Sequence, residues 1–468
     1  MKAVAERRLV DSSEQSLAEP PLAVDLDGTL VRTDLLLESL LVLLKRKPLS
    51  IFVLPLWLFR GKAYFKQQIA HRVSLDITTL PYRQDLLDDL KAQHVQGRRI
   101  VLATACDLQI ARQVADHLKL FDAVFASDGI TNLSGGSKRK GLVNEFGEKG
   151  FDYVGDHRID RAVWDSARKA IVVEDPRRGL VDYLKPLRPQ HWLKNILIFV
   201  PLLAAQRFFE KALLEKAMFA FIAFGCFASS GYLLNDLFDL AADRHHPHKR
   251  LRPFASGNLP LAYGIAMIPV LIALGGIIGL LVSPLFLAVL FVYVGLTTAY
   301  SFYLRKIVLL DVIILAGLYT MRLMAGSAAV GIWPSHWLLA FSTFLFFSLA
   351  LVKRYSELVV MRKQDGAKAT ERGYEPSDGE LLSAMGVASG YLAVLVLALY
   401  INSDAARALY GRYQLIWFQC PLLFYWISHV WLIAHRGKMP DDPVVFAVSD
   451  RTSGILALLM LAVIVVAV

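Results

Sequence analysis

Residues 235–257 read NDLFDLAADRHHPHKRLRPFASG, and this stretch decides how the rest of the chain is interpreted. Asp236, Asp239 and Asp243 are spaced by three and four residues, so on a helix they share one face. Four cations follow: Arg244, Lys249, Arg250 and Arg252. Carboxylate oxygens suit Mg²⁺, and the cations suit the remaining charge of a phosphorylated ligand. The alternative is a helix end followed by a solvated, charge-balanced loop.

The composition predicts two parts in the chain of 468 residues, which is 55% hydrophobic with a mean hydropathy of +0.44. Residues 1–185 are mixed and charged, whereas apolar runs of roughly 20 residues recur from about residue 191, each long enough to cross a bilayer. Residues 1–20 are polar and predict a flexible terminus without a signal peptide, so the soluble part is expected in the cytoplasm. Three scattered cysteines predict neither a disulfide framework nor a metal site.

The formal charge of +10 suggests nucleic acid as a partner, but the basic residues cluster in loops beside the apolar runs. Positive-inside bias and phosphate binding explain that distribution, so nucleic acid is excluded.

Nine membrane spans are expected in the C-terminal part, with the N-terminal part inside. They lie near 193–206, 213–240, 260–282, 284–304, 307–332, 336–361, 380–402, 413–434 and 452–468. The loops on the inner side then carry about 13 Lys and Arg, and the opposite loops about four. This orientation predicts a multi-pass protein of the inner membrane with its polar clusters on the cytoplasmic side.

Further polar clusters interrupt the apolar sequence. Asp311 and Arg322 lie deep within one expected span, where ionisable residues usually face a cavity. The alternative is a structural Asp–Arg pair that joins two helices. The other candidate substrate-binding residues are Lys194, Asn235, Tyr300, Tyr303, Lys306, Lys353 and Arg354, and a last acidic cluster begins at Asp441 and Asp442.

These residues carry a resemblance to a known family. Asn235–Arg244 reproduces the motif NDxxDxxxDR of the UbiA superfamily of intramembrane prenyltransferases. LRPQHWLKN, HPHKRLRPFASG, YSFYLRK, KRYSEL and DDPVVFAVSDRTS resemble the decaprenyl-phosphate phosphoribosyltransferase branch of that superfamily. The similarity covers nearly all of 186–468 and implies an all-α membrane domain. A second DxxxD motif, which prenyl-diphosphate enzymes of the superfamily carry, is missing, because the second motif offers Asp311 alone.

The resemblance implies an activity and assigns roles to residues. The branch joins a polyprenyl phosphate to C1 of 5-phosphoribosyl 1-diphosphate and releases diphosphate. Asp236, Asp239 and Asp243 would organise Mg²⁺ on the diphosphate, with Asp239 and Asp243 also counted as catalytic. The basic residues that follow them would grip phosphates.

The N-terminal part carries its own motifs. LAVDLDGT predicts a strand that ends at Asp25, followed by Asp27, and RRIVLATA predicts another strand, which ends near Thr104. FDYVGDHRID and IVVEDP predict two more, with Asp156 and Asp160 after the first of these. Strands that alternate with helical stretches such as 107–118 predict an α/β parallel sheet with its functional residues at strand ends.

Residues 20–178 resemble the haloacid dehalogenase superfamily of phosphatases, whose four motifs occur here in order. The match implies that Asp25 is the nucleophile, that Asp27 is the acid and base, and that Thr104 and Lys138 hold the phosphoryl group. It also implies a second Mg²⁺ bound by Asp25, Asp27, Asp156 and Asp160. Lys140 rivals Lys138, and a retired, non-catalytic domain is the alternative.

Residues 35–80 occupy the position of a cap domain and are unusually apolar. LSIFVLPLWLF, residues 49–59, is too short to span a bilayer, but cations flank it, so it could lie in the headgroup layer. The alternative is the core of the cap or its contact with the membrane domain.

The complete prediction is therefore a phosphatase-like domain at 21–180 fused to a transmembrane phosphoribosyltransferase domain at 186–468. The phosphatase is expected to remove the 5-phosphate from the lipid product. Two rivals remain: prenyl transfer to an aromatic acceptor, and a non-enzymatic lipid carrier with a regulatory soluble domain. The sequence neither predicts nor excludes a homo-oligomer.

Overall fold

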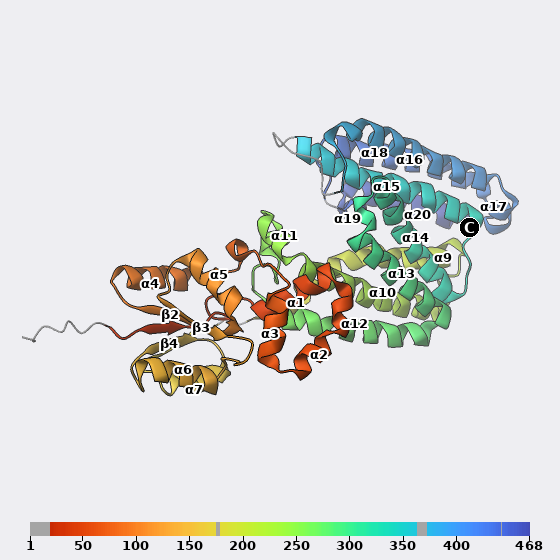
Figure 1. Ribbon diagram of the computed structural model, residues 1–468. Coiled ribbons are helices and arrows are strands. Elements are labelled where there is room, and N and C mark those ends of the chain that lie inside the picture. The colour runs from red at the N-terminus through yellow and green to blue at the C-terminus, as the bar shows by residue number, and fades with distance from the viewer. Residues whose placement is uncertain (1–18, 175–177, 363–371, 441) are drawn as a thin grey trace, which may run out of the picture. The chain divides into compact units, whose positions relative to one another are not determined.

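The computed structural model describes residues 19–174, 178–362, 372–440 and 442–468 (Figure 1). The chain divides into two compact units. The first comprises Met1–Pro186 and Leu234–Ala266, and the second comprises Leu187–Leu233 and Met267–Val468. The Asp-rich stretch is therefore grouped with the N-terminal residues. Of the terminus expected to be flexible, residues 1–18 lie outside the described residues, as does Asp441.

A parallel sheet of five strands forms the centre of the first unit, in the order β3-β2-β1-β4-β5. The strands are β1 (Leu22–Val24), β2 (Ile100–Asp107), β3 (Ala123–Ser127), β4 (Asp152–Gly155) and β5 (Ala170–Val172). The predicted parallel sheet is confirmed, but β3 was not among the strands that the sequence indicated. Strand β1 lies between β2 and β4, and Val24 is in register with both Leu102 and Val154.

Helices cover both faces of this sheet, which explains why its strands are almost wholly apolar. They are α4 (Gln84–Val95), α5 (Leu108–Leu118), α6 (Gly136–Phe146) and α7 (Arg161–Trp164). Figure 1 shows α4 and α5 on one side and α6 and α7 on the other. Because neighbouring strand residues point to opposite faces, Leu22 and Val24 join the core under α4 and α5, whereas Ala23 joins the core under α6 and α7.

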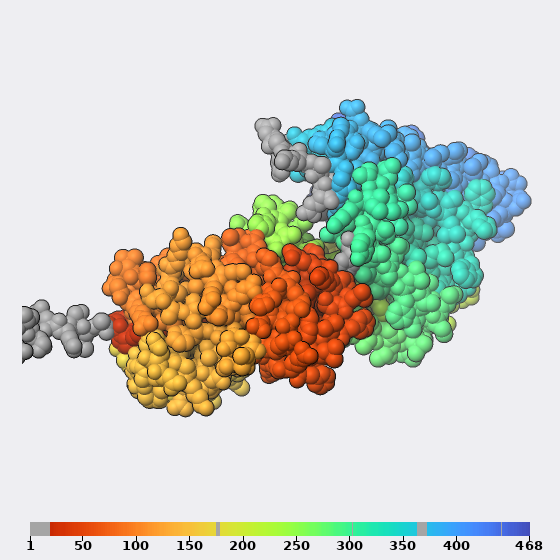
Figure 2. Space-filling view, in the orientation of Figure 1, coloured from red at the N-terminus to blue at the C-terminus, as the bar shows by residue number. Residues whose placement is uncertain are grey.

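Residues 35–80, which connect β1 to β2 in the sequence, form a helical layer. Its elements are α1 (Leu35–Arg46), η1 (Pro48–Phe52), α2 (Leu54–Phe59), α3 (Lys62–Ala70) and η2 (Ile77–Thr79). Asp34 caps the start of α1 by accepting a hydrogen bond from the Leu37 amide at 2.9 Å. These residues form the red-orange surface in Figure 2.

The Asp-rich stretch is not one continuous helix. Helix α10 (Lys211–Phe238) ends just before Asp239, and a short helix, α11 (Leu240–His245), follows. A 3₁₀ turn, η6 (Lys249–Leu251), and a loop then lead to α12 (Leu261–Val282). The remaining short helix of this unit is α8 (Leu180–Leu184).

The second unit is helical. Its other helices are α9 (Val200–Ala204), α13 (Pro284–Phe302), α14 (Leu310–Val330), α15 (His336–Arg362), α16 (Gly379–Ile401), α17 (Asp404–Leu409), α18 (Gln419–His435), α19 (Pro443–Ser449) and α20 (Arg451–Ala467). Among the described residues, seven helices are long and apolar enough to cross a membrane, or eight if the bent pair α19 and α20 is one span.

The expected count of nine spans is therefore not confirmed, and the difference lies at its first segment. Residues 193–206 were expected to form a span, but they contain the end of a 3₁₀ segment, η5 (Pro189–Phe199), and the short α9. Pro201 stands in the first turn of α9, and Gln206 has a positive φ of 58° just after it. Neither piece is long enough to span a bilayer as one helix.

Close packing on α14 leads to a first prediction. A Cβ atom on Gly326 would lie 2.1 Å from the carbonyl oxygen of Ile198 on η5, whereas a Cβ on Gly317 of the same helix would meet nothing within 4 Å. We expect Gly326→Ala to destabilise the protein by about 1–3 kcal/mol, because backbone atoms must move apart. Gly317→Ala is the matched control and should be neutral or slightly stabilising. Thermal unfolding in detergent tests this, and equal melting temperatures for the two variants would contradict it.

Candidate functional site

The ends of two neighbouring strands in the first unit, β1 and β4, bring acidic residues together. Asp25 follows β1, Asp156 follows β4, and Asp160 lies in the turn after Asp156. Carboxyl ends of adjacent parallel strands meet at one edge of a sheet, which is where such folds usually place ligands. Oxygens of Asp25, Asp156 and Asp160 lie within 4.8 Å of one another, a spacing that suits one metal ion.

One lysine completes this cluster. The Nζ atom of Lys138, on α6, lies 3.0 Å from Asp25 and 3.3 Å from Asp160, and it donates to the Tyr153 hydroxyl at 2.7 Å. That hydroxyl in turn donates to Asp160 at 2.9 Å. Lys140, the rival in the sequence, is exposed. Lys138 is therefore the lysine that reaches the carboxylates, and Tyr153 is a member of the cluster that the sequence motifs did not indicate.

Thr104 and Asp27 form hydrogen bonds with residues outside the cluster. Thr104 is fully buried on β2, and its hydroxyl oxygen accepts a hydrogen bond from the Cys106 amide at 3.0 Å. Asp27 is outside the group of three carboxylates. Its side chain accepts a hydrogen bond at 2.8 Å from the amide of Leu35, the first residue of α1. Asp27 is thus held by the helical layer, and its place among the metal ligands stays a prediction.

Burial changes the protonation of both aspartates of the DLDGT motif. It raises the pKa of Asp25 to about 6, although the charge of Lys138 opposes this rise. Burial, with the nearby charge of Asp34, raises the pKa of Asp27 to about 8. Without a bound cation, Asp27 therefore holds a proton at neutral pH, as a general acid requires.

A cavity of about 450 Å³ opens onto this cluster. One part of its lining is charged and includes Lys66 of α3, whose Nζ donates to the Ala105 carbonyl at 2.6 Å and to the Asn132 side chain at 2.8 Å. Burial lowers the pKa of Lys66. Another part is apolar, with Leu36 and Leu37 from α1 and residues 260–262 from the segment that follows the Asp-rich stretch. The cavity therefore offers a polar and an apolar wall.

The Asp-rich stretch is arranged differently from the expected single face. Arg252 bridges two of its carboxylates, because Nη1 lies 3.1 Å from Asp236 and 2.6 Å from Asp243. Asp239, at the break between α10 and α11, instead contacts Lys45 of α1 at 2.7 Å. Asp236 and Asp243 thus share Arg252 as a partner, and the helix breaks at Asp239. Asn235 stays within α10 and accepts the Asp239 amide through its carbonyl at 2.9 Å.

A buried ion pair connects the same stretch to α1. Arg244 donates to Glu38 through both terminal nitrogens, at 2.6 and 3.0 Å, and its Nε donates to the Ala255 carbonyl at 3.0 Å. Both side chains of the pair are at most 5% exposed. Lys249 and Arg250, in contrast, are exposed on η6. Arg244 therefore holds the loop, and the exposed pair remains accessible to a ligand.

Glu38 was not among the predicted site residues, and Lys45 was expected only as a cation flanking the apolar run, although the sequence carried a signal for Glu38. Glu38 is the one acidic residue in the apolar run LLLESLLVLL, and a lone acid among apolar residues usually needs a buried partner. A second close approach lies nearby. A Cβ on Gly257, whose φ is +72°, would lie 2.4 Å from the Arg32 carbonyl oxygen. Glycine thus allows the loop to lie directly against the backbone after the DLDGT motif.

In the second unit, Asp311 and Arg354 form a buried pair. Arg354 also donates to the Tyr300 hydroxyl at 2.8 Å and to Glu357 at 2.7 Å, and Tyr374 donates to Asp311. Asp311 lies in the first turn of α14 and Arg354 in the second half of α15, so the pair joins two helices. Tyr303 is 69% exposed and Lys306 is exposed on η7 (Leu304–Lys306), so neither belongs to this buried group.

Arg322 has different partners and does not pair with Asp311, so the Asp–Arg pair that joins two helices is the one between Asp311 and Arg354. Its guanidinium donates to Asn195 at 3.2 Å and to the Tyr293 hydroxyl at 3.0 Å. It also lies 5.3 Å from the ring centres of Phe224 and Tyr293. Aromatic rings and neutral oxygens stabilise this cation, so Arg322 keeps its full charge.

Lys194 and Lys353 form the remaining polar group of the second unit. Lys194 makes a buried ion pair with Asp442, which also caps α19 by accepting the Val444 amide at 3.0 Å. Lys353, next to Arg354 on α15, interacts electrostatically with Asp442 and Lys194. Lys194 and Lys353 therefore both interact with Asp442, and Lys353 also interacts with Glu357.

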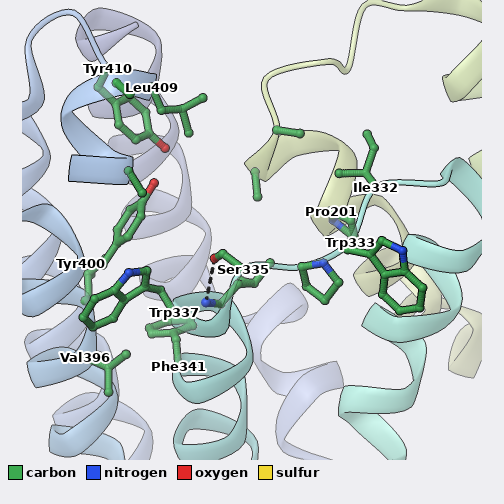
Figure 3. Close-up of a pocket in the computed structure, with 17 residues that line it drawn as sticks. Pro201, Ile332, Trp333, Ser335, Trp337, Phe341, Val396, Tyr400, Leu409 and Tyr410 are labelled. Atoms are coloured by element: carbon green, nitrogen blue, oxygen red, sulfur yellow. Dashed lines mark hydrogen bonds between the residues drawn. The ribbon is translucent and has the colours of Figure 1, made fainter. Parts of the chain in front are cut away.

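Another cavity of about 450 Å³ lies at the other ends of these helices (Figure 3). It is lined by Trp333, Trp337, Tyr400 and Tyr410 among mostly aliphatic neighbours. Its walls lie beyond the end of α14 and in the first turns of α15, so about 30 Å of helix separates it from Asp311. The lining residues that the structure describes carry no charge, so this cavity does not suit phosphate chemistry.

The comparison with known families decides the identity of the helical part. Residues 196–446 match the UbiA prenyltransferase family. The chain belongs to this family. An uncharacterized protein of Sinorhizobium fredii, y4nM, is 35% identical over 96% of this chain and 91% of its own length. That match includes most of the N-terminal residues, so the combination of both parts occurs in a second protein.

Two relatives match the UbiA part alone or little more. Nodulation protein NoeC of Azorhizobium caulinodans is 40% identical over 58% of this chain and 88% of its own length. The decaprenyl-phosphate phosphoribosyltransferase of Mycobacterium tuberculosis is 30% identical over 62% of this chain and 96% of its own length. A solved UbiA homologue from Archaeoglobus fulgidus, bound to GPP and Mg²⁺, is 19% identical with a TM-score of 0.45, over 61% of this chain and 99% of that one.

The raised pKa of Asp27 predicts a pH-dependent stability. Between its value near 3.8 in the unfolded chain and about 8 in the folded chain, the folded state binds more protons, so the free energy of unfolding falls as pH rises. Asparagine has no proton to lose. We expect Asp27→Asn to raise the melting temperature by a few degrees at pH 8 in EDTA, and by much less at pH 5.

The control for Asp27→Asn is Asp88→Asn, because the Asp88 side chain is 71% exposed. This control should change the melting temperature little at either pH. A gain from Asp27→Asn that is equal at pH 5 and pH 8 would contradict the assigned protonation.

The buried pair between Glu38 and Arg244 predicts a large loss of stability on substitution. Glu38→Gln leaves the Arg244 charge buried without its counter-ion, and we expect a cost of about 3–5 kcal/mol. Glu210→Gln is the matched control, because Glu210 pairs with Arg207 where both side chains are about half exposed. That exposed pair should contribute less than about 1 kcal/mol. Thermal unfolding compares the two variants, and similar losses of stability would contradict a larger contribution from the buried pair.

Proposed function

We propose that this UbiA-family protein transfers a 5-phosphoribosyl group from 5-phosphoribosyl 1-diphosphate to a polyprenyl phosphate and releases diphosphate. The observation that carries the proposal is the alignment with the mycobacterial decaprenyl-phosphate phosphoribosyltransferase, which covers 96% of that enzyme. The NDxxDxxxDR motif at Asn235–Arg244 supports the same activity. An oxygen of the lipid phosphate attacks C1 of the ribose, the bond from C1 to the diphosphate oxygen breaks, and diphosphate leaves.

The chemistry of the Asp-rich stretch suits this reaction. Carboxylate oxygens of Asp236, Asp239 and Asp243 are donors of the kind that Mg²⁺ prefers, and a bound Mg²⁺ would supply charge stabilisation to the departing diphosphate. In their present arrangement these three carboxylates form ion pairs with two cations, Arg252 and Lys45. With a sugar diphosphate in place, Arg252, Lys45, Lys249 and Arg250 are available to its phosphate oxygens.

The second unit offers what the lipid partner needs. A polyprenyl phosphate carries its charge on one phosphate group, so it requires cations rather than a further acidic motif. Lys194 and Lys353 both interact with Asp442 and so bring two cations together. We assign the phosphate of the lipid to these lysines. Asp311, Arg354 and Tyr300 then join α14, α15 and α13, and α15 carries Lys353.

We further propose that the N-terminal unit is a phosphatase of the haloacid dehalogenase type. The support is the convergence of Asp25, Asp156, Asp160 and Lys138 at one sheet edge, with the proton-bearing Asp27 beside them. An oxygen of Asp25 attacks phosphorus, and the ester oxygen leaves with the proton of Asp27. Asp27 then takes a proton from water, which hydrolyses the aspartyl-phosphate. Lys138 and Thr104 would hold the phosphoryl oxygens, and Mg²⁺ bound by the three carboxylates would balance their charge.

The substrate of this phosphatase is, in our proposal, the 5-phosphate of the transferase product. The cavity at the phosphatase cluster has both a charged wall and an apolar wall, which suits a phosphorylated sugar attached to a lipid. Both sites would face the cytoplasm, where 5-phosphoribosyl 1-diphosphate is found, and the protein would lie in the inner membrane. Tethering the two sites raises the effective concentration of the product at the second site.

Mass spectrometry of the lipid product tests both activities. The purified protein, reconstituted with polyprenyl phosphate, Mg²⁺ and 5-phosphoribosyl 1-diphosphate, should yield a polyprenyl-phosphoribose. Asp25→Asn should accumulate a product that is heavier by one phosphate. Asp239→Asn should lower diphosphate release at least 100-fold, because a carboxylate proposed to bind the metal is lost.

Asp88→Asn, on the exposed face of α4, is the control and should leave both products unchanged. Equal product masses from the wild type and Asp25→Asn would refute the phosphatase step alone. Activity with a prenyl diphosphate and an aromatic acceptor instead would refute the phosphoribosyl transfer. Undiminished function of Asp239→Asn would favour a carrier without catalysis.

A further inference from the structure

An exposed apolar segment lies on the first unit, outside every candidate membrane span. It consists of η1 and α2, and seven of its large apolar side chains are exposed. These are Leu49, Ile51, Phe52, Val53, Leu56, Leu58 and Phe59. Three are more than 70% exposed: Leu49 at 77%, Phe52 at 73% and Phe59 at 89%. Continuous exposure of this extent usually marks an interaction surface.

The segment is folded onto the unit by its other side. Leu54 and Trp57 pack against the buried Leu43, Ile69 and Val73. The Arg72 guanidinium lies 4.6 Å from the centre of the Trp57 ring and covers it. The alternative that this segment belongs to the core of the cap is therefore correct for Leu54 and Trp57. The exposed side chains form a separate outer face.

The charges around this outer face are all positive. Arg46 and Lys47 precede it, Arg60 and Lys62 follow it, and all four are exposed. The sequence contains no Asp or Glu between Glu38 and Asp76. Apolar side chains with flanking cations suit the interface of a bilayer that contains anionic lipids, since the cations meet headgroups while the apolar groups enter the acyl boundary.

The length of the segment excludes a transmembrane arrangement. Helix α2 has six residues and is about 9 Å long, far less than the hydrocarbon core of a bilayer. Large apolar side chains that are exposed elsewhere on this unit, such as Val95 and Ile130, have no comparable run around them. Because the same chain carries seven or eight candidate spans, a bilayer is always within reach of this unit.

We propose that η1 and α2 insert into the interfacial layer of the membrane, with Leu56 and Phe59 among the acyl chains and the flanking cations at the headgroups. The occupant of this face is the lipid surface itself. The proposal does not depend on either enzymatic activity, because it uses only the exposure, the charge and the length of residues 46–62.

Site-directed spin labelling tests this in the full chain. Cys106 and Cys226 are buried and Cys420 is partly exposed, so Cys420→Ala provides a background with little labelling. A nitroxide is then attached at Leu56→Cys or Phe59→Cys, and at Val95→Cys or Ile130→Cys as controls. The measured quantity is the frequency with which each label collides with oxygen, which enters the bilayer, or with a water-soluble nickel chelate. In nanodiscs that contain phosphatidylglycerol, we expect the collision frequency of labels at 56 and 59 to be at least threefold higher with oxygen than with the nickel chelate. Labels at 95 and 130 should show the reverse preference.

Two other outcomes would overturn the proposal. If the nickel chelate reaches labels at 56 and 59 as well as it reaches the controls, the segment is in water. If neither reagent reaches them, protein covers the segment, and spin–spin broadening between labels would identify a second copy of the chain as the cover. All four positions are exposed, so the variants should fold, and the melting temperature of each labelled protein checks this.

Discussion

Charge held away from water is the constraint on which this structure depends. Transfer of an isolated ion out of water is very costly, so each buried charge needs a partner close by. Lys138 lies among carboxylates at the sheet edge, Glu38 holds Arg244, and Asp311 holds Arg354. Each of these contacts joins segments far apart in the sequence. Compensation of buried charge therefore positions functional side chains and stabilises the fold at the same time.

Much of the first unit could be predicted from the sequence, because its signals are local. Apolar runs predicted four of the five parallel strands, and strand order then brings Asp25 and Asp156 to one edge. Strand β3, with the sequence AVFAS, was not among the predicted strands. The choice of Lys138 over Lys140 needed the structure, since burial on one face of α6 separates them. In the helical unit, the lengths of the apolar runs predicted most of the candidate spans, but residues 193–206 do not form one.

The pairings within the polar clusters could not be predicted, because they depend on tertiary contacts. Spacing alone placed Asp236, Asp239 and Asp243 on one helical face, whereas the helix ends at Phe238 and Asp239 adopts a non-helical φ of −102° with ψ of 15°. The partner of Asp239 comes from residue 45, nearly 200 positions earlier. Likewise, Asp311 and Arg322 look like partners in sequence, yet each is satisfied by a different helix.

Helix α1 contacts an acidic residue at each of its ends, Asp27 and Asp239. At its first residue, the Leu35 amide holds Asp27, and near its last turn Lys45 holds Asp239. Twelve residues at 1.5 Å each make a helix about 18 Å long. Opposite ends of this one helix therefore hold Asp27 and Asp239 within the first unit, so a substitution that displaces α1 would change the surroundings of both carboxylates.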